Sequence, residues 1–204
     1  MKKPVLLIII LNLLVAGLNS QSVNVKGGVS VAEGLYKLYV TKMATDNIAG
    51  LHLGITGEVP FSDSFYLNAG VTLMKKGTKV EMTGAGEKIR IRYLEIPVNV
   101  AYKYDFGTWK ILLQTGPYMG IGLSARIRHE NDTEKIEFGP ADDQYNRMDY
   151  GINLGGGIEI DRIQVVLGYG LGFPDLSNFN SQTIRNRIYT LSLVYSLNDL
   201  LSSR

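Results

Sequence analysis

The strongest constraint on this chain is a period of two: apolar and polar residues alternate over long segments from residue 49 onward. Such alternation is typical of β-strands whose two faces meet different environments. The clearest segment covers 109–127, and further segments cover 49–59, 67–73, 94–104, 150–160, 163–173 and 189–197. With a first strand expected over 24–31, the pattern predicts eight strands, an even number that suits a closed transmembrane barrel.

The connections between these segments also alternate in length. The connections 60–64, 105–108 and 161–162 are short, whereas 33–47, 75–90, 128–147 and 174–186 are long. Short turns at one end and long loops at the other are typical of outer-membrane barrels. We therefore predict an all-β fold: an eight-stranded antiparallel up-and-down transmembrane β-barrel with short periplasmic turns and long extracellular loops.

The composition of the two faces indicates which one meets lipid. The apolar face is bulky and unbroken, and aromatic residues gather near the short turns, as in an interfacial girdle. The other face mixes glycine with polar residues, and we predict that it lines the lumen with His52, Glu58, Glu95, Lys103, Lys110, Gln114, Arg126 and Glu159. Alternation alone leaves one alternative open: a secreted, soluble, lipocalin-like barrel that binds an apolar ligand.

The first twenty residues have the pattern of a secretory signal peptide. Lys2 and Lys3 precede an apolar run and then small and polar residues. We predict a cleaved signal peptide over 1–20, a barrel over 21–197, and a short C-terminal tail over 198–204. The protein is thus expected to leave the cytoplasm.

The composition excludes several classes of protein. The 204 residues contain no cysteine, which excludes disulfides and thiol chemistry, and the two histidines make a multi-histidine metal site improbable. The net charge of +2 equals the contribution of Lys2 and Lys3. The mature chain is then near neutral, which argues against a nucleic-acid-binding protein. We expect no metal and no cofactor.

A small lipid-modifying enzyme of the outer membrane is a further alternative. Ser124, His129 and Glu130 lie close together in the sequence, and a small lipid-modifying enzyme of the outer membrane would need such groups. A catalytic triad requires three convergent side chains, whereas Ser124 is predicted to face the lumen and Glu130 to lie in a loop. We therefore expect no enzyme and no catalytic residue.

Two of the predicted loops carry opposite charge. The segment 75–92 contains six basic residues and two acidic ones, whereas 128–149 contains three basic and seven acidic. One hypothesis is that the basic loop contacts lipopolysaccharide phosphates or an acidic partner; the basic residues are Lys75, Lys76, Lys79, Lys88, Arg90 and Arg92. The alternative is that the two loops pair with each other above the barrel.

Two mid-strand prolines predict an irregular ladder. The apolar face shifts parity at Tyr93/Leu94, and Pro97 and Pro117 each lack an amide donor. A turn centred between Phe106 and Gly107 would place Pro97 opposite Gly116. We predict a bulge between Tyr93 and Pro97, a gap in the ladder, and adjacent prolines.

Several short motifs resemble the PorT-like outer-membrane β-barrel family of Bacteroidetes. They are Tyr93-Leu94-Glu95-Ile96-Pro97, Gly116-Pro117-Tyr118-Met119-Gly120, Asp149-Tyr150-Gly151 before Gly155-Gly156-Gly157, and Asn186-Arg187. The resemblance implies an eight-stranded outer-membrane barrel and, for the family's namesake, a part in type IX secretion. It offers no catalytic residue. The chain departs from many such barrels at its end, where Tyr195 and Leu197 are followed by 198–204.

These observations together suggest a function. An eight-stranded barrel is just wide enough for side chains to fill its interior, and the predicted lumen contains both signs of charge. We expect a closed-lumen anchor or binding platform in the cell envelope, with outer-membrane lipid or lipopolysaccharide as a partner. Envelope or secretion-system proteins are further candidate partners.

Overall fold

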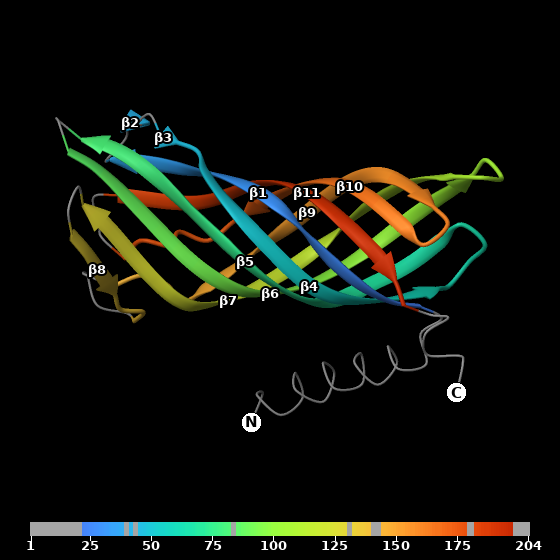
Figure 1. Ribbon diagram of the computed structural model, residues 1–204. Helices are drawn as coiled ribbons and strands as arrows, with labels where there is room; N and C mark the ends of the chain where they lie inside the picture. Colours follow the sequence, from blue (N-terminus) through green and yellow to red (C-terminus); the bar gives the residue numbers. More distant parts are fainter. Residues whose placement is uncertain are drawn as a thin grey trace, which may run out of the picture.

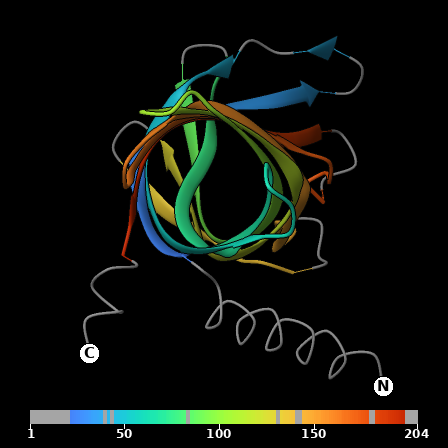
Figure 2. The ribbon, with the colours of Figure 1, turned by 90° about the vertical axis from the view of Figure 1, so that its right-hand side faces the viewer.

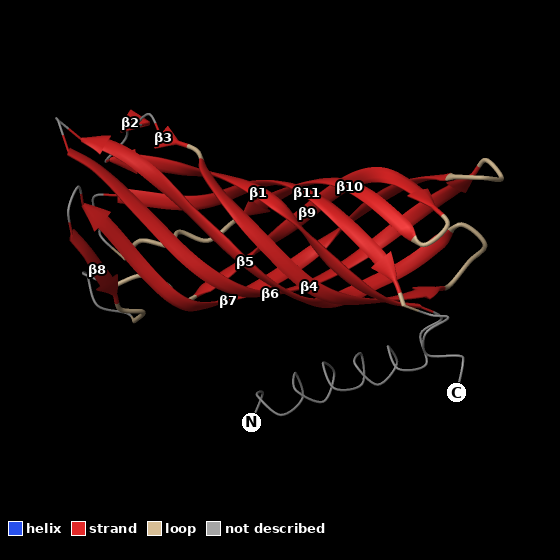
Figure 3. Ribbon diagram, in the orientation of Figure 1, coloured by secondary structure: helices blue, strands red, loops and turns tan. Residues whose placement is uncertain are grey.

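A computed structural model describes residues 22–38, 41–42, 45–82, 85–129, 132–139, 144–178 and 182–197. The predicted signal peptide over 1–20 and the tail over 198–204 lie outside the described residues. Strands dominate the described part (Figure 3). Among the residues described, no helix is long and apolar enough to cross a membrane.

Eight long strands form the wall of a barrel (Figure 1). They are β1 (Ser22–Leu38), β4 (Ile48–Pro60), β5 (Phe65–Met82), β6 (Ala85–Asp105), β7 (Lys110–His129), β9 (Met148–Ile160), β10 (Ile163–Gly172) and β11 (Gln182–Ser196). Each pairs antiparallel with the next, and β11 pairs with β1 from Asn24↔Ser196 to Leu38↔Gln182. The end-on view shows the resulting closed ring (Figure 2). The predicted eight-stranded fold is confirmed.

The two ends of the barrel differ as the sequence indicates. The turns 61–64, 106–109 and 161–162 lie at one end, on the right of Figure 1. The short strands β2 (Thr41–Lys42), β3 (Thr45–Asp46) and β8 (Asp132–Ile136) lie at the opposite end. Gly107 has a φ of 95°, a conformation that favours glycine in such a turn. The short-turn end is periplasmic and the other is extracellular.

The outer wall is apolar and the inner wall is largely polar. Many leucine, isoleucine and valine side chains point outward, and Leu51 and Leu167 are 67% and 66% exposed. Rings also pack at the periplasmic rim, where the centroids of Phe106 and Trp109 are 4.5 Å apart. Glycine lets the inner wall close tightly: a Cβ on Gly116 would lie 2.0 Å from the carbonyl oxygen of Val98. The prediction of lipid outside and polar groups inside is confirmed.

The predicted loop over 75–90 is wrong, because β5 and β6 continue as one long hairpin. Their pairing runs from Lys75↔Arg92 to Met82↔Ala85. At 18, 21 and 20 residues, β5, β6 and β7 are the longest of the described strands. Such lengths exceed the ~9–11 residues needed to cross the bilayer, so their upper parts rise above it.

The ladder between β6 and β7 is irregular, but not where the sequence placed the irregularity. The register shifts between Arg92 and Tyr93, so that Leu123 is the extra residue on β7. The prediction of a bulge on β6 between Tyr93 and Pro97 is therefore wrong. The predicted gap in the ladder is confirmed, since the pairing passes from Pro97↔Tyr118 to Val100↔Thr115. The register differs by two residues from the predicted one. Pro97 pairs with Tyr118, the residue after Pro117, and not with Gly116.

The bulge changes which side chains face the lumen in the upper part of β7. Below it the odd-numbered residues point outward, and above it Ala125 points inward while Arg126 is exposed. Strand β6 keeps its parity throughout, and Ile89, Ile91 and Tyr93 are buried inside. The sequence pattern predicted that these three residues, together with Ala125 and Ile127, lie on the apolar outer face. That prediction is wrong for Ile89, Ile91, Tyr93 and Ala125, whose side chains are buried inside the barrel.

An apolar plug fills the extracellular mouth of the barrel. Besides residues of the wall, it contains Tyr145 and Leu176, which lie between strands and are 5% and 0% exposed. Phe138 packs against the same cluster. The amide of Asn146 donates to the carbonyl of Leu176, and the amide of Leu176 donates to Ile184 on β11. Segments that the sequence assigned to long loops thus fold back into the barrel.

Candidate functional site

The lower lumen is crossed by an ionic cluster around Lys103 of β6. Its ammonium lies 2.5 Å from Glu58 of β4 and 2.6 Å from Glu159 of β9. Gln164 of β10 donates to the same carboxylate of Glu159 at 3.0 Å, and the Tyr66 ring lies 4.5 Å below the ammonium. Four strands are thereby tied together across the lumen. We call this set the lower cluster.

The upper lumen holds a second lysine between two carboxylates. Lys76 of β5 lies 2.7 Å from Glu95 of β6 and 2.9 Å from Asp149 of β9. Asn186 of β11 donates to Asp149 at 2.9 Å, and the ring of Tyr118 lies 4.1 Å from the ammonium. This upper cluster sits directly under the apolar plug. Because an uncompensated charge here would be costly, the pairing is a condition for burying these groups.

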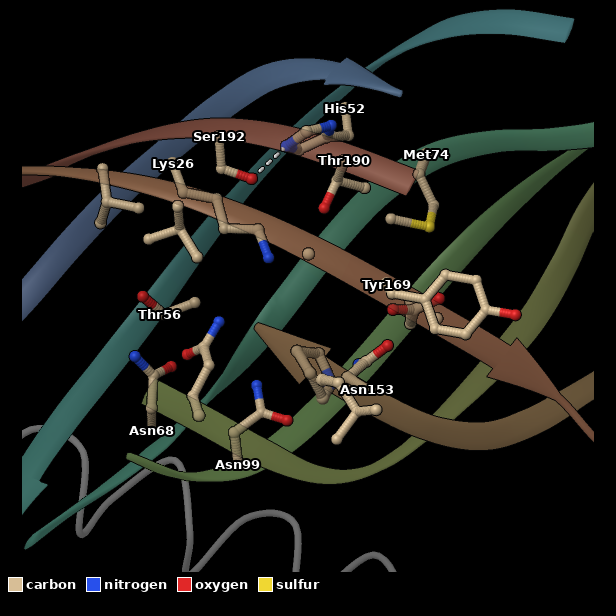
Figure 4. A pocket seen from close by; sticks show the side chains of 18 of the residues that line it. Lys26, His52, Thr56, Asn68, Met74, Asn99, Asn153, Tyr169, Thr190 and Ser192 are labelled. Atoms are coloured by element: carbon tan, nitrogen blue, oxygen red, sulfur yellow. Dashed lines mark hydrogen bonds between the residues drawn. The ribbon is translucent and has the colours of Figure 1, made fainter. Parts of the chain in front are cut away.

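Between the two clusters lies a cavity of about 60 Å³ (Figure 4). Hydroxyl and amide side chains surround it, and Lys26 of β1 points into it. Several buried polar atoms of the wall have no protein partner, including Oδ1 of Asn99 and Oγ1 of Thr56. The volume suits roughly four to six water molecules, which would satisfy these atoms. The cavity is too small for a lipid or a peptide substrate.

One pair beside the cavity has the elements of a nucleophile and a base. Nε2 of His52 lies 2.9 Å from Oγ of Ser192, and both side chains are buried. Nδ1 of His52 has no hydrogen-bond partner, so no carboxylate orients the ring. A hydrolytic triad needs that third group and access for a substrate. The pair therefore serves as a hydrogen bond that joins β4 to β11 on the inner face of the wall.

The structure places most of the predicted lumenal residues inside the barrel. His52, Glu58, Glu95 and Lys103 are buried, Gln114 lines the cavity, Glu159 belongs to the lower cluster, and Lys110 lies at the periplasmic edge. Arg126 is the exception: it is exposed on the outer wall, because the bulge at Leu123 reverses the upper part of β7. Its predicted lumenal position is wrong.

Of the upper cluster, only Glu95 was predicted to face the lumen. Lys76 was assigned to a basic loop and Asp149 to an acidic one, yet they form an ion pair inside the barrel. The signal was present, because Lys76 continues the inward positions of Thr72 and Met74 on β5. Tyr118 and Asn186 carry no charge and were named only within the family motifs, without a predicted place in the lumen.

The six predicted basic residues do not form a loop, and the set divides between the two faces of the wall. Lys76 is buried in the upper cluster, whereas Lys75, Arg90 and Arg92 are exposed on the outer wall of β5 and β6. Lys79 pairs with Asp46 of β3 at 2.8 Å. Lys88 is half-buried on the outer wall of β6.

Few other groups of the described chain have the chemistry of a site. Within the described ranges, no group of three or more His, Asp or Glu side chains is placed to hold a metal ion. The side chain of His129 and the residue Glu130 lie outside the described part, so the arrangement weighed with Ser124 is not seen. The features that remain are the filled lumen and the basic outer wall.

A closed eight-stranded wall with an apolar outside and a polar inside defines an integral β-barrel of the Gram-negative outer membrane. The chain belongs to the family described as outer membrane protein beta-barrel domain, which matches residues 17–178. This membership excludes the soluble lipocalin-like alternative. No curated protein sequence matches the chain.

Solved structures of outer-membrane barrels are similar in fold. Ail of Yersinia pestis, in complex with the heparin analogue sucrose octasulfate, is 12% identical, with 86% of this chain and 97% of that chain covered at a TM-score of 0.44. OprG of Pseudomonas aeruginosa is 12% identical, with 86% and 95% covered and a TM-score of 0.47. The outer membrane protease OmpT of Escherichia coli is 8% identical, with 86% and 96% covered and a TM-score of 0.43.

Proposed function

We propose that this barrel is closed to solutes and serves as an anchor or binding platform in the outer membrane. The observation that carries the proposal is the filled lumen. Two ionic clusters cross it at different heights, and the apolar plug covers the upper one. Aqueous pores belong to barrels of ~16–18 strands, whereas eight strands leave an interior that side chains can fill.

The extracellular rim supplies the surface for a platform. The segments around Tyr145 and Leu176 are held by backbone hydrogen bonds to one another and to β11, so a rigid wall supports them. Binding residues are commonly carried by loops on such a scaffold. The periplasmic turns are short and offer less surface.

Planar bilayers test the closed lumen. The purified full-length barrel is expected to show no steady single-channel conductance. A Lys76→Ala/Lys103→Ala variant removes both central cations, and the carboxylates left behind should then admit cations in brief openings. Steady, large conductance in the unaltered monomer would overturn the proposal, whereas a variant that stays silent would show that the apolar plug is enough to close the lumen without the two lysines.

We also propose that the protein is not an enzyme. The described nucleophile–base pair, His52 and Ser192, faces a cavity too small for a lipid and lacks an orienting carboxylate. A Ser192→Ala variant checks this point. Turnover of outer-membrane lipids by the unaltered protein, lost in the variant, would show that the pair is catalytic.

We propose a finer assignment to the PorT-like group on the motifs around Tyr93–Pro97 and Asp149–Gly151. In the structure, three of these residues, Tyr93, Glu95 and Asp149, belong to or border the upper cluster. A link to a secretion assembly follows only from that resemblance. Crosslinking in the native outer membrane tests it, because recovered neighbours either include secretion-system proteins or do not.

A further inference from the structure

The outer wall of β5, β6 and β7 changes abruptly from apolar to basic. Leu73 of β5 pairs with Leu94 of β6, and the next outward pair up the wall is Lys75↔Arg92. The change is complete within two residues, about 7 Å along the strand. On the outer face of a transmembrane barrel, such a change from apolar to basic is expected where lipid tails give way to headgroups. The change follows the strands into the part that rises above the bilayer.

The basic side chains form three rows across neighbouring strands. The first row is Lys75 and Arg92. The second is Arg90, Arg126 and Lys135, and the third is Lys79, Lys88 and Arg128. We call these eight residues the basic outer surface. Arg126, Arg128 and Lys135 were absent from the predicted set, and it is the bulge at Leu123 that turns the first two outward.

Each row sets like charges directly opposite one another. Lys75↔Arg92, Lys79↔Lys88, Lys88↔Arg128, Arg90↔Arg126 and Arg126↔Lys135 are all registered cross-strand pairs. Like charges in such positions destabilise a sheet. Burial, together with the charges of Arg90, Arg128 and Lys79, lowers the pKa of Lys88, which lies above the lipid-facing band. The surface therefore repels itself.

The described part of the chain supplies little counter-charge for this surface. Lys79 pairs with Asp46, but none of the other seven side chains has an ion pair within the described ranges. The acidic segment after β7 was the expected partner. Its one ion pair to the predicted basic set in the described chain joins Asp149 to Lys76, inside the barrel. Within the described ranges, mutual pairing of the two segments thus does not neutralise the basic outer surface.

The basic outer surface covers only one side of the barrel. On the strands that follow along the wall, aromatic side chains are exposed instead: Tyr150 of β9, Phe173 just after β10 and Tyr189 of β11 are about half exposed. Arg187 of β11 also lies on that wall, where it faces Glu33 of β1 in the register. A ligand attracted by charge alone would therefore meet the barrel from the side of β5, β6 and β7.

We propose that the basic outer surface binds the phosphate groups of lipid headgroups in the outer leaflet, the phosphorylated lipid A of lipopolysaccharide. Several phosphates held in one plane would bridge the rows and relieve the five repulsive pairs. The surface begins at headgroup height, which favours a membrane lipid over a soluble acidic protein. The proposal rests on the outer-membrane location and is independent of the closed lumen.

The test measures binding of bisphosphorylated lipid A to the detergent-solubilised full-length barrel. Arg90→Gln/Arg92→Gln/Arg126→Gln removes one charge from the first row and two from the second. Since each basic residue near an anionic lipid surface is worth ~1 kcal/mol, the affinity at low salt should fall roughly 100-fold. Arg185→Gln/Arg187→Gln on β11 is the matched control and should leave the affinity unchanged.

Further arms identify the source of the phosphate. Dephosphorylated lipid A should bind far more weakly than the bisphosphorylated form, and inorganic phosphate should not displace it. Equal binding of both lipids, or equal affinity of the triple variant and the unaltered protein, would overturn the proposal. Displacement by inorganic phosphate would instead identify a small-anion site, and capture of an acidic protein without affinity for lipid A would identify a protein interface; both also overturn it.

The free energy of unfolding supplies a second readout. A variant that simply failed to fold would not give the result expected here. In neutral detergent the triple variant should resist urea better than the unaltered protein, because repulsion is relieved. In phosphatidylcholine vesicles that contain bisphosphorylated lipid A, the order should reverse. The same order in both environments would contradict bridging by phosphate.

Discussion

The two ends of the lumen use the same chemical arrangement in different surroundings. Each holds a lysine between two carboxylates from two other strands of the barrel. The lower cluster opens toward the periplasmic rim, where Lys110 approaches Glu159 and its side chain is 34% exposed. The upper cluster lies under the apolar plug, and the side chains of Lys76 and Asp149 are 1% and 0% exposed.

The difference shows how the plug determines the energetic role of an ion pair. Water near the rim screens the lower cluster and can solvate a group that loses its partner. The upper cluster is more enclosed, because Lys76 and Asp149 are covered by the protein and only Glu95 also borders the cavity. We therefore expect the salt bridges under the plug to contribute more to the free energy of unfolding than their counterparts near the rim.

Removing the upper lysine should have the largest effect. Lys76→Met leaves Glu95 and Asp149 facing each other without a cation, and breaking a buried pair costs about 3–5 kcal/mol of the free energy of unfolding. Urea unfolding of the detergent-folded barrel, followed by the gel shift of the folded form, measures it. The triple variant Lys76→Met/Glu95→Gln/Asp149→Asn should recover most of the loss. A single variant as stable as the unaltered protein would show that the upper cluster is hydrated.

Removing part of the plug should come next. Leu176→Ala deletes a fully buried side chain and should cost about 2–3 kcal/mol, since a residue between strands can partly relax into the space. The same unfolding assay measures it, with Leu51→Ala on the lipid-facing wall as the control of similar chemistry. If the plug excludes water from the upper cluster, Leu176→Ala should also lessen the additional cost of Lys76→Met. Strict additivity of the two changes would contradict that coupling.

Removing the lower lysine should be milder. We expect Lys103→Met to cost about 1–2 kcal/mol, below the range for a fully buried pair, because Lys110 and water near the rim compensate Glu58 and Glu159. Urea unfolding at low and high salt checks this, and the cost should shrink as salt rises. If Lys103→Met lowered the free energy of unfolding as much as Lys76→Met does, independently of salt, the proposed contrast between the two ends would be wrong.

The smallest effect should have the opposite sign. Arg90→Gln relieves the repulsion with Arg126 on the outer wall and should stabilise the barrel in neutral detergent by about 0.2–1 kcal/mol. Arg185→Gln serves as the control on the opposite wall. A loss of stability in Arg90→Gln would mean that this arginine has a compensating partner within the protein.

The same contrast explains what could be read from the sequence. Glu58, Lys103 and Glu159 were predicted to face the lumen because they lie close to tight turns, where alternation is regular. The upper cluster escaped because Lys76 and Asp149 were assigned to loops, a consequence of ending the strands where the apolar outer face ends. Above the membrane a strand can continue with charged residues outward and apolar residues inward, which reverses the hydropathy pattern without reversing the geometry.

The bulge was signalled by sequence but placed on the wrong strand. Ile89, Ile91 and Tyr93 suggested a change of parity on β6, whereas these residues keep their parity and form part of the plug. The extra residue is Leu123 on β7, where Ala125 and Arg126 exchange sides. A single sequence contains no information on the partner register that would distinguish the two strands.

The extra residue at Leu123 also bears on how such a barrel can change over time. A substitution alters one side chain, but an insertion or deletion at this point exchanges every side chain above it between the two faces of β7. Deleting Leu123 would turn Arg126 and Arg128 toward the plug and Ala125 toward the outside. The gain or loss of a single residue here would therefore put charged side chains inside the barrel and apolar ones outside. We expect the length of β7 at this point to vary far less than the residue type.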